Sequence, residues 1–216
     1  MIVIQFLAML TMLIDHIGLI WFPDNPAWRI IGRLAMPFYA YAVVLGYFRT
    51  GNIGRYLKRM GFIALLSQLP YQIAFHQLEV NTVGSLFVCL LLLVLMDKWK
   101  EKRAVQVLLA AGAALLVELV PFSYGAYIVL LVLIYRYAAV QWMTLFHFSL
   151  SVVSLAVKGF GWILQLFSLS ATFLIVYMPD SLRKLDGIRI PRFIWRSFYP
   201  AHLLLLAALR DLPAIQ

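Results

Sequence analysis

Charged side chains are scarce in this chain: Asp, Glu, Lys and Arg make up 12% of its 216 residues, whereas 64% are hydrophobic. In an ordinary soluble domain about a quarter of the residues are charged and roughly half are apolar. A compact domain of this length needs a largely polar surface and cannot bury so much apolar side chain. The composition therefore excludes a soluble enzyme and a nucleic-acid-binding domain as leading interpretations, and it predicts that lipid surrounds most of the chain.

Cysteine and the common catalytic motifs are also lacking. Cys89 is the single cysteine, so the sequence offers no internal disulfide and no CxxC metal motif. The chain contains no GxGxxG, P-loop, HExxH or GxSxG sequence. The histidines are scattered without metal-ligand spacing, so no metal site is predicted: they are His16, His76, His147 and His202.

Long apolar runs are what the chain does contain. A membrane-spanning helix needs about 20 mainly apolar residues, and breaks at charge clusters, Pro and Gly leave about nine such runs. We predict an all-α, polytopic membrane bundle that forms a single domain over residues 1–216. The first run contains Asp15 and begins without Lys or Arg, unlike a cleaved signal peptide. The predicted spans are 2–22, 28–48, 60–76, 82–97, 104–120, 124–138, 141–158, 161–178 and 193–211.

The excess of positive charge predicts the orientation of these spans. The formal net charge is +9. With a cytoplasmic N-terminus, fourteen of the 18 Lys and Arg residues fall in segments on the cytoplasmic side. Membrane proteins concentrate Lys and Arg on that side. We therefore interpret the net charge as a topology signal rather than as a sign of nucleic-acid binding.

Three ionisable side chains fall inside the first two predicted spans. Asp15 and His16 lie in the outer half of span 2–22, and Arg33 follows the outer end of span 28–48. Ionisable groups at membrane depth are costly and by default suggest function. An Asp15–Arg33 ion pair that fixes helix packing is one interpretation. Because adjacent helical residues point about 100° apart, His16 faces another partner and is either a structural or a catalytic histidine.

Polar residues also recur at helical spacing along four further spans. Such residues either join helices through hydrogen bonds or line a hydrated cavity. Four such stripes, together with the buried ionisable residues, favour the interpretation as a cavity. Pro37 lacks the N–H that would bond the carbonyl of Arg33, which suits either a cavity wall or a simple kink. The stripes are Gln68, Tyr71 and Gln72; Asn81, Ser85 and Cys89; Thr144, His147, Ser151, Ser154 and Lys158; and Gln165, Ser168 and Thr172.

Six segments, in order along the chain, together resemble the TraX family. They are MLTMLIDHIG (9–18), IGRLAMPFYAY (31–41), RYLKRMGFIALLSQLPY (55–71), NTVGSLFVCLLLL (81–93), YGAYIVLLVLIY (124–135) and FYPAHLLLL (198–206). The resemblance implies a protein like the conjugative-pilin acetylase, within the wider class of transmembrane acyltransferases that includes acyltransferase family 3. It also implies a place in the bacterial cytoplasmic membrane. The chain departs from the family pattern over 178–192, and the role of that loop stays open.

The resemblance further implies transfer of an acyl group from cytosolic acyl-CoA to an acceptor at the outer face. His16 suits a general base because imidazole exchanges protons near neutral pH. Arg33, Tyr124 or Tyr127 would bind the thioester oxygen, and a basic loop would bind the CoA phosphates. The predicted catalytic residues are His16, Asp15, Arg33 and His202, and the predicted donor-binding residues are Arg55, Lys58, Arg59, Tyr124 and Tyr127.

Two other classes of function stay open on the sequence alone. A small transporter would use the buried ionisable cluster to handle protons or an anionic solute, although no internal repeat of the kind common in transporters is evident. A non-enzymatic assembly protein for a surface structure would need no such cluster. The acceptor, a pilin-like peptide or a glycan, the acyl chain length and the oligomeric state are not fixed by the sequence.

Overall fold

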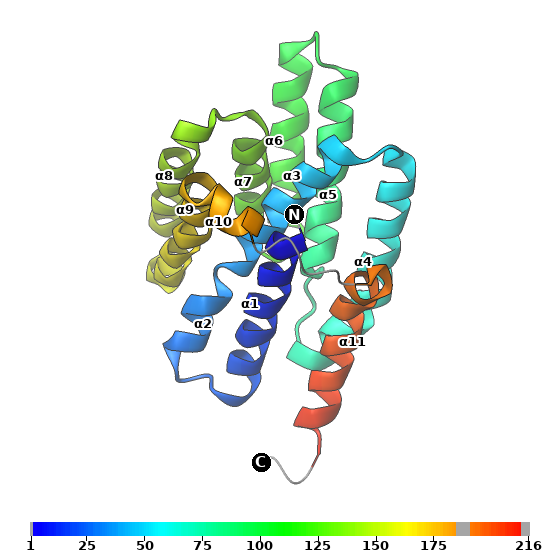
Figure 1. Cartoon of the computed structure of the whole chain (residues 1–216), viewed down its shortest axis with the longest axis vertical. Coiled ribbons are helices and arrows are strands. Elements are labelled where there is room, and N and C mark those ends of the chain that lie inside the picture. The colour runs from blue at the N-terminus through cyan, green and yellow to red at the C-terminus, as the bar shows by residue number, and fades with distance from the viewer. Residues whose placement is uncertain (1, 185–190, 213–216) are drawn as a thin grey trace.

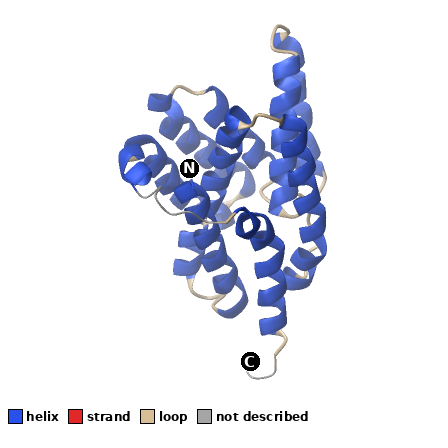
Figure 2. Cartoon of the chain, turned by 45° about the vertical axis from the view of Figure 1, so that its right-hand side comes forward, coloured by secondary structure: helices blue, strands red, loops and turns tan. Residues whose placement is uncertain are grey.

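The computed structural model describes residues 2–184 and 191–212, which form helices joined by short loops (Figures 1 and 2). No β-strand occurs among these residues, and one isolated bridge joins Val80 to Phe122. The predicted all-α fold class is confirmed. The helices are α1 (Ile2–Trp21), α2 (Pro26–Gly32), α3 (Ala35–Arg49), α4 (Ile53–Phe75), α5 (Thr82–Lys98), α6 (Arg103–Leu119), α7 (Ala126–Tyr137), α8 (Val140–Lys158), the 3-10 helix η1 (Phe160–Ser168), α9 (Leu169–Tyr177), α10 (Pro179–Lys184) and α11 (Arg192–Arg210).

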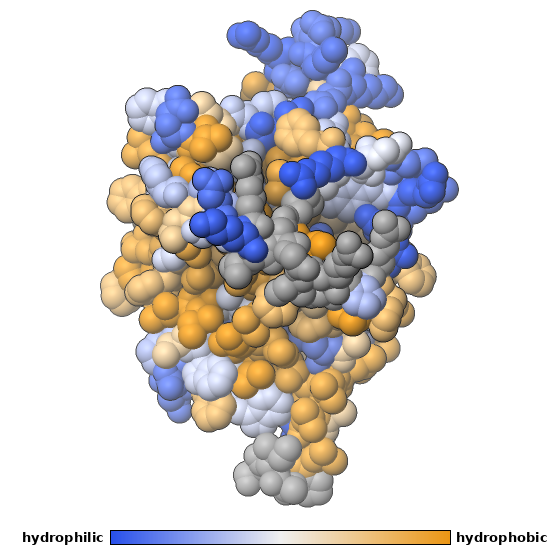
Figure 3. Space-filling model, in the orientation of Figure 1, coloured by the Kyte–Doolittle hydropathy of each residue, from blue (hydrophilic) through white to orange (hydrophobic). Residues whose placement is uncertain are grey.

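Four helical segments in the described part of the chain are long and apolar enough to cross a membrane. They are Ile2–Trp21, Pro26–Arg49, Val140–Lys158 and Phe160–Tyr177. Figure 3 shows a broad hydrophobic belt, with hydrophilic side chains gathered over the turn between α5 and α6. The other predicted spans coincide with helices α4 to α7 and α11, and their crossing of the bilayer stays a prediction.

Two predicted spans are less regular than the sequence suggests. The span 28–48 is two helices, because the chain turns at Arg33 and Leu34 between α2 and α3. Pro37 explains the position of the break, since it lacks the N–H that would continue the helix back to Arg33. The span 161–178 begins as the 3-10 helix η1 and becomes α-helical at Leu169. Each break falls inside a segment that is long and apolar enough to cross a membrane.

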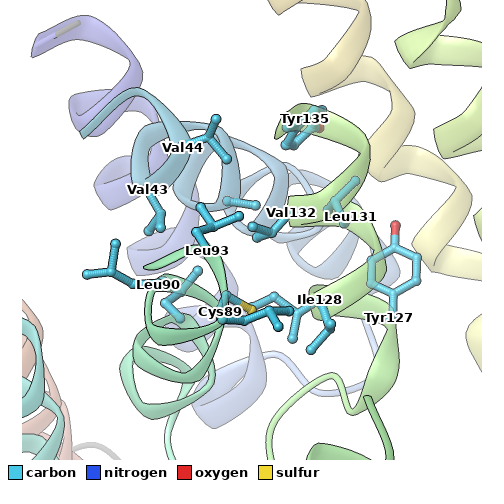
Figure 4. Close-up of a cluster of buried hydrophobic side chains, with 14 of the residues drawn as sticks. Val43, Val44, Cys89, Leu90, Leu93, Tyr127, Ile128, Leu131, Val132 and Tyr135 are labelled. Carbon is cyan, nitrogen blue, oxygen red and sulfur yellow. The ribbon is translucent and has the colours of Figure 1, made fainter. Parts of the chain in front are cut away.

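The shortest predicted span forms the centre of the bundle. α7 packs against α3, α5, α6 and α8, so apolar residues occur on all its sides. Figure 4 shows Leu93 of α5 facing Val132 of α7, and Leu90 and Ile128 belong to the same buried cluster. Cys89 is fully buried in the same cluster as a small apolar side chain. This core holds α3, α5 and α7 together, and α1, α4 and α11 lie next to these three helices.

Candidate functional site

Asp15 is held between two arginines of the neighbouring helical segment. Arg29 Nη1 donates to Asp15 Oδ2 at 2.8 Å, and Arg33 Nη2 lies 3.4 Å from Asp15 Oδ1. Gly32 permits this approach, because a Cβ atom at that position would overlap the Asp15 carboxylate. The predicted Asp15–Arg33 pair is therefore present. Arg29, which the sequence analysis did not single out, is the closer partner.

Arg33 is held less tightly than Arg29. Its Nη1 lies 3.4 Å from Gln165 Oε1 in η1, and its buried Nε has no hydrogen-bond partner in the described part of the chain. Because arginine carries donors only, the Gln165 oxygen faces Arg33. The Gln165 amide nitrogen is then buried without a partner among the described residues. The Arg33 guanidinium also lies 5.9 Å from the centre of the Tyr124 ring. A cation with unfilled donors suits a carbonyl oxygen or an anion.

His16 and His202 bring the first and last long helices into contact. Nδ1 of His16 lies 3.0 Å from Nε2 of His202, and both side chains are buried. The two rings are nearly parallel, with their centres 5.1 Å apart. Phe75 of α4 meets the His16 ring edge-on, and Phe198 of α11 stacks on the His202 ring. Aromatic packing therefore fixes both imidazoles in place.

A backbone carbonyl determines how protons are arranged in this pair. His202 Nδ1 lies 2.7 Å from the carbonyl oxygen of Phe198, which only accepts hydrogen bonds. In the neutral pair His202 therefore carries its proton on Nδ1, and its Nε2 accepts from Nδ1–H of His16. His16 Nε2 is left with a free lone pair. A general base requires an unprotonated nitrogen of this kind.

A cavity of about 400 Å³, which we call the histidine cavity, opens beside His16. Its lining combines the charged cluster with polar loop residues, and it contains Tyr124 but not Tyr127 or His202. The lining includes Asp15, His16, Arg29, Arg33, Glu79, Thr82, Tyr124 and Gln165. The cavity is therefore both charged and roomy enough for a small substrate group.

Two loops that border the histidine cavity are fixed by hydrogen bonds. Ser123 Oγ donates to the Val80 carbonyl at 3.1 Å and lies 3.2 Å from the Tyr71 hydroxyl. The Asn81 amide donates to the side chain of Gln68 at 2.8 Å, and its oxygen caps the start of α5. The polar stripes of α4 and α5 thus join these helices to each other and to the cavity wall.

A second cavity, which we call the basic cavity, has a volume of about 470 Å³ and lies nearer the start of α1. Gln5 and Met9 line the basic cavity, whereas Asp15 and His16 line the histidine cavity one to three turns further along α1. The basic cavity is lined by Arg59 of α4 and Arg196 of α11, with Trp195 beside the second arginine. Its deeper wall is mostly apolar and ends on α11 at Tyr199.

The wall between the two cavities contains the histidine pair. Tyr199 lines the basic cavity and contacts the His202 ring edge-on, with 5.6 Å between the ring centres. His202 in turn contacts His16, which lines the histidine cavity. On α5 the consecutive residues Thr82 and Val83 line the histidine and basic cavities respectively. Two cavities therefore approach one buried imidazole pair from opposite ends of the bundle.

Comparison with known proteins gives a family model described as TraX protein, which matches residues 2–210. The chain belongs to the TraX family. A related protein, named as a probable fimbrial assembly protein FimC, serogroup H1, from Dichelobacter nodosus, is 24% identical over 240 residues. That match covers 95% of this chain and 93% of the relative. No solved structure matches this chain.

The structure brings five of the predicted site residues together. Asp15, Arg33 and Tyr124 line the histidine cavity beside His16, and His202 supports His16 from behind. Tyr127 lies elsewhere, and its ring points away from the other buried side chains of the α5–α7 cluster (Figure 4). Its hydroxyl lies 2.6 Å from His147 Nε2 in α8. His147 Nδ1 is also 2.6 Å from Thr172 Oγ1. The stripes of the seventh and eighth predicted spans therefore bond to each other.

The basic residues predicted to bind the donor divide into two groups. Arg59 lines the basic cavity, whereas Arg55 and Lys58 do not appear in its lining. The cavity also contains Arg196, which the sequence analysis did not single out as a donor-binding residue. The predicted departure from the TraX pattern over 178–192 falls partly on residues 185–190, which lie outside the described residues.

Proposed function

We propose that this TraX protein is a membrane acyltransferase that moves an acyl group, most simply acetyl, from acyl-CoA to an amine or hydroxyl group of an acceptor. The observation that carries the proposal is the contact between His16 and His202 in the wall between two cavities. One cavity is basic and the other contains the candidate base. An acyl group that passes this wall travels between opposite ends of the bundle.

In this proposal the basic cavity faces the cytoplasm and receives the donor. The charge distribution supports that orientation, with a cytoplasmic N-terminus and about nine spans in the bacterial cytoplasmic membrane. Arg59 and Arg196 bind the CoA phosphates, because guanidinium pairs well with phosphate oxygens. Arg55 lies one turn before Arg59 in α4, Lys58 immediately precedes Arg59, and both add positive charge near the entrance.

His16 acts as the base in the transfer step. An acceptor N–H or O–H enters the histidine cavity and gives its proton to His16 Nε2 as the nitrogen or oxygen bonds to the thioester carbon. His202 shares the resulting positive charge through its contact with His16. The carbon–sulfur bond then breaks, and the departing CoA thiolate takes the proton that the histidine pair holds. This yields the acylated acceptor and free CoA and returns His16 to its neutral form. General base catalysis of this kind contributes about 10² to 10⁴ in rate.

The groups around Arg33 stabilise the charge that develops during this step. Arg33 offers unfilled donors, the Gln165 amide adds another, and Tyr124 lies against the guanidinium. Donors held in place before the reaction stabilise an oxyanion without having to reorganise. Asp15 holds Arg33 at the cavity wall and partly balances the charge of Arg29 and Arg33.

The identity of the acceptor is proposed from the name of the relative and not from the lining of the histidine cavity. The relative from Dichelobacter nodosus is named for fimbrial assembly, which supports a pilin-like peptide whose amino terminus enters the histidine cavity. A hydroxyl of a glycan would require the same base and the same donor. The proposed transfer chemistry is therefore independent of which acceptor is bound.

The proposal is tested by measuring acetyl-CoA binding and thiol release with the purified protein in nanodiscs, in the presence of a pilin-like peptide with a free amino terminus. We expect saturable binding and thiol release by the wild type. His16→Ala should bind acetyl-CoA normally and lose thiol release. His76→Asn is the matched control, because His76 is exposed at the end of α4. Full thiol release by His16→Ala would overturn the role of His16.

A transporter is the second candidate, because two cavities that approach a buried ionisable pair from opposite ends also suit alternating access. A transporter moves solute without consuming a thioester. Absence of acyl-CoA binding in the nanodisc experiment, with both acetyl-CoA and longer acyl-CoAs, would contradict the acyltransferase and favour this candidate. A purely structural assembly protein would neither bind the donor nor move solute.

A further inference from the structure

The Tyr199 hydroxyl is a buried polar group with no bonded partner among the described residues. Tyr199 lies in α11, is 6% exposed and lines the deep end of the basic cavity. Its oxygen forms no hydrogen bond to any residue that the structure describes. Buried hydroxyls are normally paired, because an unmade hydrogen bond is costly. This oxygen therefore marks a place where a ligand can supply the missing partner.

The position of Tyr199 relates this hydroxyl to the proposed reaction. Tyr199 precedes His202 by three residues, so the two side chains lie on neighbouring positions of one helix face. Their rings touch edge-on, and His202 leads directly to His16. The phenol also lies close to Thr82, which lines the histidine cavity. The geometry between the two residues does not meet that of a hydrogen bond. Tyr199 thus stands at the point where the basic cavity reaches the wall.

We propose that the Tyr199 hydroxyl donates a hydrogen bond to the thioester carbonyl of the acyl donor. This inference rests on the proposed acyltransferase function and identifies the residue that positions the donor's reacting end. Arg59 and Arg196 hold the phosphate end near the entrance of the same cavity. Tyr199 holds the carbonyl of the bound donor at the inner end, beside His202, and the groups around Arg33 act afterwards, in the transfer step.

The surroundings of the hydroxyl favour the thioester over other parts of the donor. The inner lining includes Met9, Ile63 and Leu86, which are apolar and suit a short acyl chain. The charged parts of CoA belong near the arginines. An acyl carbonyl is the acceptor that distinguishes acyl-CoA from CoA itself. The proposal therefore predicts a contact that acetyl-CoA makes and CoA does not.

Tyr199→Phe tests this contact because it removes the hydroxyl and keeps the ring against His202. We expect affinity for acetyl-CoA to fall by about five- to tenfold, as for one hydrogen bond, while affinity for CoA and desulfo-CoA stays at the wild-type level. The Michaelis constant for acetyl-CoA should rise by a similar factor. Tyr56→Phe removes another phenol from the same cavity and should leave the ratio of acetyl-CoA to CoA affinity unchanged.

The outcomes separate this inference from the proposed function. Equal loss of acetyl-CoA and CoA affinity, or no loss of either, in a folded Tyr199→Phe protein would overturn the thioester contact alone. Failure of the wild type to bind any acyl-CoA would overturn the acyltransferase itself. A thermal unfolding measurement establishes that the variant is folded. Tyr199→Met, which also lacks the hydroxyl, replaces the first variant if that one is unstable.

Discussion

Nδ1 of His16 and Nε2 of His202 lie 3.0 Å apart, although 186 positions separate the two residues in the chain. The contact joins α1 to α11, and the Phe198 carbonyl orients it from the far side. It also stands between the basic cavity and the histidine cavity. The proposed transfer depends on this one contact more than on any other.

Replacing His202 by Phe tests how much His16 depends on it. The variant keeps an aromatic ring beside Phe198 but removes the nitrogen that accepts from His16. We expect the transfer rate to fall by about 10- to 100-fold, less than for His16→Ala, because the base itself remains. Acetyl-CoA affinity should stay unchanged, and the pH profile of the rate should shift. An unchanged rate and pH profile in the folded variant would contradict the supporting role of His202.

The two arginines at Asp15 should differ in what their removal costs. Arg29 is the closer partner, so Arg29→Ala leaves the carboxylate poorly paired and should lower the free energy of unfolding by about 1–3 kcal/mol. Arg33 holds Asp15 more loosely and faces the cavity with unfilled donors, so Arg33→Ala should mainly lower the transfer rate. Thermal unfolding and single-turnover rates measured on both variants check this division. The reverse pattern, with Arg29 controlling rate and Arg33 stability, would refute it.

Gly32 should be intolerant of even one added methyl group. Its Cβ would overlap Asp15, so Gly32→Ala forces α1 and α2 apart and should destabilise the protein by about 1–3 kcal/mol. Gly112 is the matched control, because nothing lies within 4 Å of a Cβ atom there. Gly112→Ala in helix α6 should be neutral or slightly stabilising. Equal unfolding temperatures for the two variants would show that the Asp15 contact does not require glycine.

Much of the helical arrangement could be predicted from the sequence, because helix ends follow breaks in hydropathy. The proximity of Asp15 to Arg33 was also predictable, since a short turn joins consecutive helices and both residues lie at similar depth. The break at Arg33 was harder to predict from the sequence. Pro37 indicated an unbonded carbonyl, but only the structure shows that the helix ends there. A proline permits either a kink or a break, and packing decides which occurs.

Contacts between distant segments could not be predicted in the same way. Arg29 and Arg33 are four residues apart, so their shared face was a signal that they act together. By contrast, no local pattern relates His202 to His16 or Arg196 to Arg59. Tyr127 shows the opposite difficulty: its position near Tyr124 suggested one site, but the helix turns its side chain toward His147. Such placements depend on how helices pack, which periodicity does not determine.

Sidedness of the reaction tests the central claim most directly. Wild-type protein reconstituted in sealed vesicles, in one orientation, would be given acetyl-CoA at the face where the basic cavity opens and a pilin-like peptide only at the opposite face. We predict acetylated peptide on the peptide side and free CoA on the donor side, with no product from His16→Ala. Product that forms only when donor and peptide share one face, or no product in either arrangement, would contradict transfer across the His16–His202 wall.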